Sequence, residues 1–370
     1  MRPFKRIPLI QRRFNSYSSH LATARKACLE ALRQYDKSSY VLSAYVPEPA
    51  RDAYIAIRAF NLELSKITGS DPNQVNQRLK SSLGFTSTDL RIKFWEDMLL
   101  KLFQDPFADR VIGEPVGILL RDALRNELKF DPSHFDQMLS TRNDFLQRQE
   151  FRTVDEVCSY GEGQFSQLNY LEQDLLLSDQ ISPSTVSLVE QNDDIAILMR
   201  EICAHLGQAT GVATIVLATQ YYARHTNRIY LPVDVMASYD LSQEDLLRLF
   251  QGHEDIDKER ITTQLKDVVY ETCITANDHL LTARSKLKQV KELTAKFLDT
   301  TSDAMILERS KNWKCGLPDC LFVPFMNAIP LHGYLQALEK NDFNIVDSKF
   351  ENSYWKLVYK SYSSYKSRTI

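Results

Sequence analysis

The stretch GQATGVATIVLATQYYARHTNRIYLP, residues 207–232, decides the fold of this chain. If residues 207–223 are helical, four residues fall on one face at the spacing i, i+4, i+7, i+11, and that face carries no charge. These residues are Val212, Val216, Thr219 and Ala223. An uncharged face of this length predicts a helix packed in a core. A polar, basic turn follows, and Pro232 disfavours helix for the residue before it.

The remaining sequence is also dominated by helical periodicity. Apolar residues make up 44% of the 370 positions, with only 13 prolines and 11 glycines, which favours an all-α chain over a sheet protein. The helices predicted from apolar spacing cover about 20–45 with a short link, 50–67, 90–105, 113–128, 133–149, 154–177, a stretch from Asp193 through the central helix, 258–298, and a last segment through Leu338. No run of 18 uncharged apolar residues exists, so any membrane contact is expected to be peripheral.

The end of the central stretch resembles the squalene/phytoene synthase family, whose members join two prenyl diphosphates head to head. In the active enzymes the corresponding helix ends in D-x-x-x-D, followed by a basic turn and R-I-Y-L-P. The last block is present here as Arg228–Pro232, and the two aspartate positions fall on Thr219 and Ala223. The resemblance implies an all-α isoprenoid-synthase-like helical bundle, which we expect to span residues 20–350.

A second landmark of the same family lies upstream, at the right distance. Residues 51–60, RDAYIAIRAF, match the helix that leads into the first aspartate-rich motif, and Asn61 and Ser65 occupy the aspartate positions. Glu63 does not replace them, because two residues along a helix is a rotation of about 200°. Lys66 adds a positive charge beside the site if it points that way.

The four substitutions bear directly on chemistry. Aspartates at i and i+4 share one face, where they hold Mg²⁺ against a substrate diphosphate. Asn61, Ser65, Thr219 and Ala223 supply an amide, two hydroxyls and a methyl group instead. We therefore predict degenerate substrate-pocket positions, no catalytic residues, no metal and no cofactor. Two alternatives stay open: an active prenyl diphosphate transferase with an unconventional site, and a mitochondrial lipid- or isoprenoid-binding protein.

The N-terminus differs in kind from the rest of the chain. Residues 1–19 contain Arg2, Lys5, Arg6, Arg12 and Arg13, several hydroxyl residues and no acid. This composition is typical of a mitochondrial transit peptide, and the alternative is a basic arm on a cytosolic protein. The net charge of −3 argues against nucleic acid as a partner.

The C-terminal residues 351–370 form a basic, aromatic tail. After Glu351 there is no acid, while three lysines and an arginine alternate with tyrosines and Trp355. Such a tail can lie on an anionic membrane surface. A solvated helix packed on the domain by Trp355 and Leu357 is the interpretation we favour.

Other conspicuous residues are interpreted as structural. The six scattered cysteines are expected to be free thiols, and His205 has no ligand partner at i+4. Tyr160 and Tyr170 are interpreted as core or rim aromatics. The segment 142–144 resembles a family segment near the pocket, but a solvated face is the favoured interpretation.

Four features together resemble a non-catalytic mitochondrial branch of the family: the leader, the pattern R-A-F-N-x-E-L at 58–64, the block at 228–234 and the block at 341–344. This resemblance implies a role in the assembly of mitochondrial respiratory complex I, on the matrix side of the inner membrane. The partners it implies are complex I assembly intermediates or other assembly factors, with a peripheral contact to the inner membrane.

Overall fold

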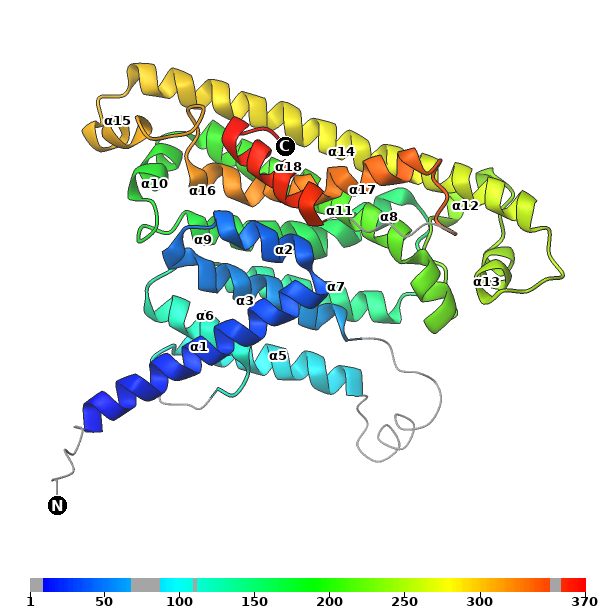
Figure 1. The fold of residues 1–370 in the computed structure, drawn as a ribbon, viewed down its shortest axis with the longest axis horizontal. Coiled ribbons are helices and arrows are strands. Elements are labelled where there is room, and N and C mark those ends of the chain that lie inside the picture. Colours follow the sequence, from blue (N-terminus) through cyan, green and yellow to red (C-terminus); the bar gives the residue numbers. More distant parts are fainter. Residues whose placement is uncertain (1–8, 68–86, 109–111, 347–353) are drawn as a thin grey trace.

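The computed structural model describes residues 9–67, 87–108, 112–346 and 354–370, and within these ranges the chain is a bundle of helices without a β-strand (Figure 1). The helices are α1 (Leu9–Tyr35), α2 (Lys37–Leu42), η1 (Ser43–Tyr45), α3 (Glu48–Ser65), α5 (Ser87–Gln104), α6 (Pro115–Arg125), α7 (Pro132–Gln147), α8 (Val154–Gly161), η2 (Glu162–Ser166), α9 (Gln167–Leu176), α10 (Pro183–Glu190), α11 (Asp193–His225), α12 (Val233–Ser238), α13 (Gln243–Gln251), α14 (Lys258–Thr300), α15 (Ala304–Ser310), α16 (Asp319–Phe322), η3 (Val323–Asn327), α17 (Ala328–Lys340) and α18 (Tyr354–Ser367). The all-α prediction is confirmed. The short helices α10, α12 and α15 were not predicted, and most of the predicted loop after Gly69 lies outside the described residues.

Helix α11 is the axis of the bundle and packs along α14, which runs along one side of the molecule (Figure 1). The predicted core face is confirmed, because Val212, Val216, Thr219 and Ala223 are all fully buried. The helix begins at Asp193, as its acidic first turn indicated, and ends at His225, before the proline. Among the described helices, α11 alone is long and apolar enough to cross a membrane. In its apolar stretch of 18 residues, however, 61% is buried inside the bundle, as expected of a core helix.

A close crossing of two backbones fixes α11 against the helical run α8–η2–α9. A Cβ on Gly207 would lie 2.1 Å from the Ser166 Oγ, and a Cβ on Gly211 would lie 2.4 Å from the Gly161 Cα. At the crossing the run takes one π-helical turn, Glu162–Ser166. Apart from this turn, the single helix predicted for 154–177 is confirmed.

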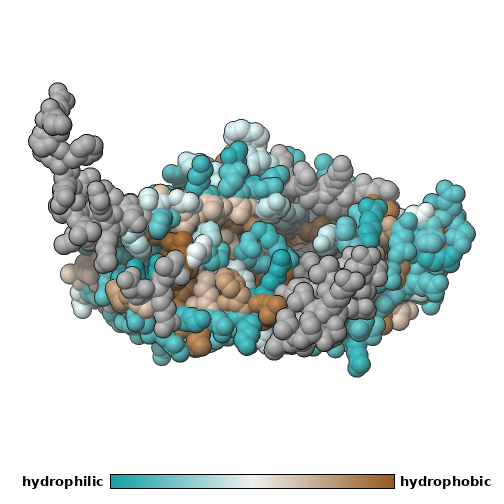
Figure 2. All heavy atoms as spheres, turned by 90° about the horizontal axis from the view of Figure 1, so that it is seen from below, coloured by the Kyte–Doolittle hydropathy of each residue, from teal (hydrophilic) through white to brown (hydrophobic). Residues whose placement is uncertain are grey.

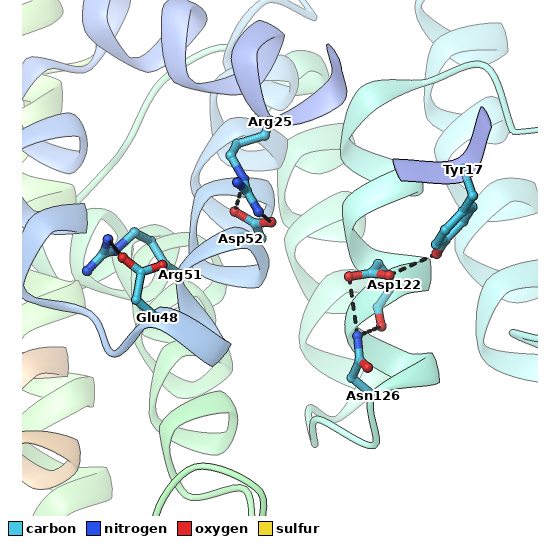
Figure 3. Close-up of polar contacts among 7 residues, drawn as sticks. All are labelled: Tyr17, Arg25, Glu48, Arg51, Asp52, Asp122 and Asn126. Atoms are coloured by element: carbon cyan, nitrogen blue, oxygen red, sulfur yellow. Dashed lines mark hydrogen bonds and ion pairs between the residues drawn. The ribbon is translucent and has the colours of Figure 1, made fainter. Parts of the chain in front are cut away.

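Helix α1 lies across α3 and α6 (Figure 3). The Arg25 Nε donates to Asp52 of α3 at 2.6 Å, and the Tyr17 hydroxyl donates to Asp122 of α6 at 2.9 Å. The predicted leader boundary after residue 19 falls inside this helix. On this side of the bundle apolar residues gather in the middle of the surface (Figure 2), and Leu90, Phe94 and Leu100 of α5 are among the exposed apolar side chains.

Helix α18 packs back on α17, α2 and η3, so the predicted packed helix is confirmed. Leu357 is buried, but Trp355 is 77% exposed. The prediction that Trp355 anchors the helix is therefore wrong. The anchor is Arg368, which is fully buried and paired with Asp319.

Candidate functional site

Asn61 of α3 lies at the wall of a cavity of about 190 Å³. Its Oδ1 accepts a hydrogen bond of 3.0 Å from the Gln164 Nε2 of the π-helical turn. The opposite walls come from α9, α11 and the η3–α17 segment, with polar groups such as Asn169 and Asn327 beside apolar Leu217 and Leu331. Of the four predicted positions, Asn61 is the one that borders this cavity.

Arg58, one turn before Asn61, carries the positive charge of the cavity wall and is paired with Glu172 of α9. Arg58 is 8% exposed and Glu172 1%. Burial works against the charge on Arg58, but Glu172, Tyr54 and Asp36 together outweigh it and raise the pKa of the guanidinium above its ordinary value. The other carboxylate oxygen of Glu172 accepts from the Asn327 Nδ2 at 3.1 Å.

The charge balance of this cavity is unfavourable to an anion. Asp36 and Arg58 are the charged residues among the described lining residues, and Glu172 already neutralises Arg58. The remaining formal charge is the carboxylate of Asp36, which caps α2 by accepting from the Ser39 backbone N–H at 3.0 Å. A diphosphate placed in this cavity would meet net negative charge.

Ser65, the second position of the first motif, does not face the cavity. Its hydroxyl donates to the Leu62 carbonyl oxygen at 2.7 Å, and the side chain is exposed at the end of α3. Lys66 points away as well and pairs with Glu63 at 2.7 Å, which agrees with the expected outward direction of that carboxylate.

Thr219 and Ala223 lie inside the packed core, and the cavity reaches α11 at Thr210, Ala213, Thr214 and Leu217 instead. The Thr219 hydroxyl donates to the Ile215 carbonyl oxygen of its own helix at 3.0 Å. The structure therefore does not bring the four predicted positions together around one space.

Arg142 of α7 connects the end of α3 with the end of α11. Its guanidinium donates to the carbonyl oxygens of Ser65 at 3.0 Å and Ile67 at 2.7 Å. It also neighbours the hydroxyl of Tyr222, whose pKa is raised to about 12 by burial although Arg142 opposes that rise. The predicted solvated face is therefore wrong for Arg142, which is 6% exposed, whereas Asp144 is exposed.

The rings around Arg142 form a continuous aromatic cluster. Tyr230 of the R-I-Y-L-P block lies 4.8 Å from Phe145 and 4.9 Å from Tyr222, measured between ring centroids. Tyr160 lies 4.9 Å from Phe145, as expected of a core aromatic. Arg228, the first residue of the block, donates to the Arg148 carbonyl oxygen at 2.6 Å. Arg142 and this cluster thus connect the R-I-Y-L-P block with the end of α3, where the first motif lies.

Local sequence reasoning missed the partners that come from distant segments. Nothing in the sequence around Arg58 indicated that its partner is Glu172. His205, correctly interpreted as having no ligand at i+4, has its Nδ1 2.8 Å from the Nδ1 of His279 on α14. Burial lowers the pKa of both imidazoles.

Within the described residues no group of three or more His, Cys, Asp or Glu side chains is placed to hold a metal ion, and all six cysteines are free.

Comparisons with known proteins agree on one family. A family model described as squalene/phytoene synthase matches residues 32–358. Similar curated proteins are NADH dehydrogenase (ubiquinone) complex I, assembly factor 6, from Homo sapiens, 28% identical over 315 residues (85% of this chain, 81% of that protein), and the same factor from Bos taurus, 27% identical over 318 residues (86% and 74%).

Two solved structures with a similar fold are named as synthases. A dehydrosqualene synthase in complex with ligand superposes with a TM-score of 0.58 at 13% identity, covering 96% of this chain and 99% of the other. The squalene synthase HpnC from Alicyclobacillus acidocaldarius gives 0.58 at 12% identity, covering 88% and 96%. At these identities the likeness concerns the fold.

Proposed function

This chain belongs to the squalene/phytoene synthase family, and from that premise we propose that it acts in the assembly of mitochondrial respiratory complex I without catalysing prenyl transfer. The assembly role is supported by the 27–28% identity, over most of the chain, to proteins named complex I assembly factor 6. Its partners are complex I assembly intermediates or other assembly factors. Its location is the matrix side of the inner membrane, in agreement with the leader-like composition of residues 1–19.

The loss of catalysis is supported by the geometry at the cavity. Metal-assisted ionisation of a diphosphate needs carboxylates that hold Mg²⁺ and cations that stabilise the departing anion. At the matching positions Asn61 faces Gln164, Ser65 bonds its own helix, and Thr219 and Ala223 are buried. Among the described residues that line the cavity there is one guanidinium, that of Arg58, and it is neutralised by Glu172.

The lipid-carrier alternative is not favoured by the cavity beside Asn61, and a larger hollow of about 980 Å³ lies elsewhere, between α5 and the start of α6. At about 190 Å³ the cavity beside Asn61 is smaller than the roughly 300–1,000 Å³ of typical small-molecule pockets. A native lipid extract of the purified protein tests this alternative, and a stoichiometric isoprenoid or other apolar ligand in that extract would revive it.

The assembly role is tested by deleting the gene in the source organism and resolving respiratory complexes on native gels. We expect fully assembled complex I to be lost or reduced while the other respiratory complexes remain, and plasmid-borne wild-type protein to restore it. A normal complex I pattern in the deletion strain would refute the role.

Catalytic silence is tested separately on the purified protein. Incubation with farnesyl or geranylgeranyl diphosphate and Mg²⁺ should give no coupled product, with a dehydrosqualene synthase run in parallel as the positive control. Coupled product from this chain would show that an unconventional site works, whatever the assembly experiment shows.

A further inference from the structure

Helix α18 carries two opposite stripes of residues with the same spacing. The inward stripe is Leu357, Ser361 and Ser364, and Arg368 follows directly after the end of the helix; all four are buried. The outward stripe is Trp355, Tyr359, Tyr362 and Lys366, which starts two residues earlier and so lies about 200° away around the helix. Trp355 is 77% exposed, Tyr359 73% and Tyr362 55%. A surface helix of a globular protein normally has the reverse arrangement, with its large apolar groups inward.

The orientation of α18 is fixed by its buried side. The Arg368 guanidinium pairs with Asp319 and lies over two rings, 4.9 Å from the Phe322 centroid and 4.4 Å from that of Tyr365. The Tyr365 hydroxyl donates to the other oxygen of Asp319 at 2.7 Å. Small serines at 361 and 364 let the helix lie close to its neighbours. Because Arg368 and Tyr365 hold α18 in this orientation, Trp355, Tyr359 and Tyr362 point outward.

The charge on the outer side of α18 has one sign. Lys356 and Lys366 are exposed, and the Lys360 Nζ donates to the neutral Gln336 Oε1 at 2.7 Å. None of the ion pairs in the described ranges involves these three lysines, and residues 354–370 contain no acid. The chain as a whole carries a net charge of −3, so this positive surface is a local feature.

We propose that the outer face of α18, formed by Trp355, Lys356, Tyr359, Tyr362 and Lys366, docks on the headgroup layer of an anionic phospholipid bilayer. Trp and Tyr combine an apolar ring with a polar tip and suit the boundary between headgroups and acyl chains. Lysine stems cover apolar surface while their ammonium groups reach anionic headgroups. A protein partner is less suited to this face, because the cores of protein interfaces are depleted in lysine. The inference does not depend on the assembly role.

The test uses the full-length protein and flotation with lipid vesicles. The wild type should bind vesicles of phosphatidylcholine containing phosphatidylglycerol, bind pure phosphatidylcholine vesicles weakly, and dissociate as salt rises. Each lysine near an anionic surface strengthens binding about fivefold, so the double variant Lys356→Gln/Lys366→Gln should bind about 25-fold more weakly. The double variant Trp355→Ser/Tyr359→Ser should lose binding to both vesicle types.

The matched control removes the same charge from another helix. Lys288→Gln/Lys296→Gln on α14 takes two exposed lysines away from a different surface and should bind like the wild type. Thermal unfolding checks that each variant is folded, which we expect because the replaced side chains are exposed. Wild-type protein that does not float with anionic vesicles overturns the proposal, as do outer-face variants that float equally well. Variants that float normally but lose a protein partner on native gels would identify a protein interface instead, and this too would overturn it.

Discussion

Replacing Glu172 by glutamine removes one charge of a buried pair and leaves the other without a partner. Arg58 and Glu172 are 8% and 1% exposed, and their pairing joins α3 to α9 beside the cavity. Breaking a buried pair from one side costs about 3–5 kcal/mol, because the remaining charge stays desolvated. This is a large part of the roughly 5–15 kcal/mol that stabilises a typical domain. An unfolding entropy of about 2.1 cal/mol/K per residue gives about 0.8 kcal/mol/K for this chain, so we expect the Tm of Glu172→Gln to fall by about 4–6 °C.

Two further variants separate this cause from a general disturbance of the core. The double variant Arg58→Met/Glu172→Leu removes both charges and should recover most of the loss. Asn327, which would lose Glu172 as an acceptor, still donates to the Asn169 Oδ1 at 3.0 Å and to the Pro324 carbonyl oxygen at 3.1 Å. Glu201→Gln breaks the partly exposed pair with Lys286, and as the control should cost less than about 1 kcal/mol.

The same substitution should also change which ligands the cavity accepts. With Glu172 neutral, the Arg58 guanidinium at the cavity wall becomes an unpaired cation, and a small anion such as inorganic phosphate becomes its natural partner. Phosphate should then raise the Tm of Glu172→Gln in a concentration-dependent way and leave the wild type and Glu201→Gln unchanged. Differential scanning calorimetry measures both effects. A Glu172→Gln protein as stable as the wild type, or a double variant less stable than the single one, would refute the reasoning.

Four other outcomes follow from the structure. Gly211→Ala should destabilise the fold by about 1–3 kcal/mol, because its Cβ would meet the Gly161 backbone at 2.4 Å, whereas Gly113→Ala, which meets nothing within 4 Å, should be nearly neutral in urea titrations. Burial raises the pKa of Glu114 from 4.5 to about 7, so the folded chain keeps a proton that the unfolded chain releases; stability should fall as pH rises through this window, and Glu114→Gln should flatten the slope of Tm against pH. Burial lowers the pKa of His205 and His279, so stability should fall as pH drops below their ordinary value of about 6.5, and a His279→Gln protein with the same acid sensitivity as the wild type would contradict this. Restoring aspartate at Asn61, Ser65, Thr219 and Ala223 together should destabilise the protein without creating Mg²⁺-dependent binding of pyrophosphate in calorimetry, since Thr219 and Ala223 do not reach the cavity.

The sequence predicted those parts of the fold whose signals are local. Periodicity placed α11 and its buried face correctly, because one helix keeps the same side inward over many turns. It also found α14 to within two residues of its end. The short helices α10 and α12 carry too few turns for a periodic signal, and Trp355 was assigned to the core because an aromatic residue is usually buried.

The candidate site was harder to predict because its decisive contacts join distant segments. The spacing of Asn61, Ser65, Thr219 and Ala223 showed which carboxylates are absent, but nothing local to Arg58 indicates Glu172, which lies more than a hundred residues away. The same holds for Arg142, because its acceptors are the backbone carbonyl oxygens of Ser65, the last residue of α3, and of Ile67. Every residue has a backbone carbonyl, so a sequence cannot indicate which one accepts. The loss of metal chemistry therefore stays a prediction from the sequence, whereas the contacts of Arg58 and Arg142 could be seen only in the packed structure.

Three arginines of the bundle have their acceptors within the protein. Guanidinium groups are the side chains best suited to a phosphate ligand, and a cavity that kept them unpaired would be destabilised by its own positive charge. Here each guanidinium has an internal acceptor: Arg58 pairs with Glu172, Arg142 donates to the end of α3, and Arg228 donates to the Arg148 carbonyl oxygen at the end of α7. The contacts of Arg58 and Arg142 tie α3 to α9 and α7, and that of Arg228 ties the segment after α11 to the end of α7, so these cations brace the bundle. The shape of the family is thus held by the protein's own side chains and does not need a bound anion to neutralise these three charges.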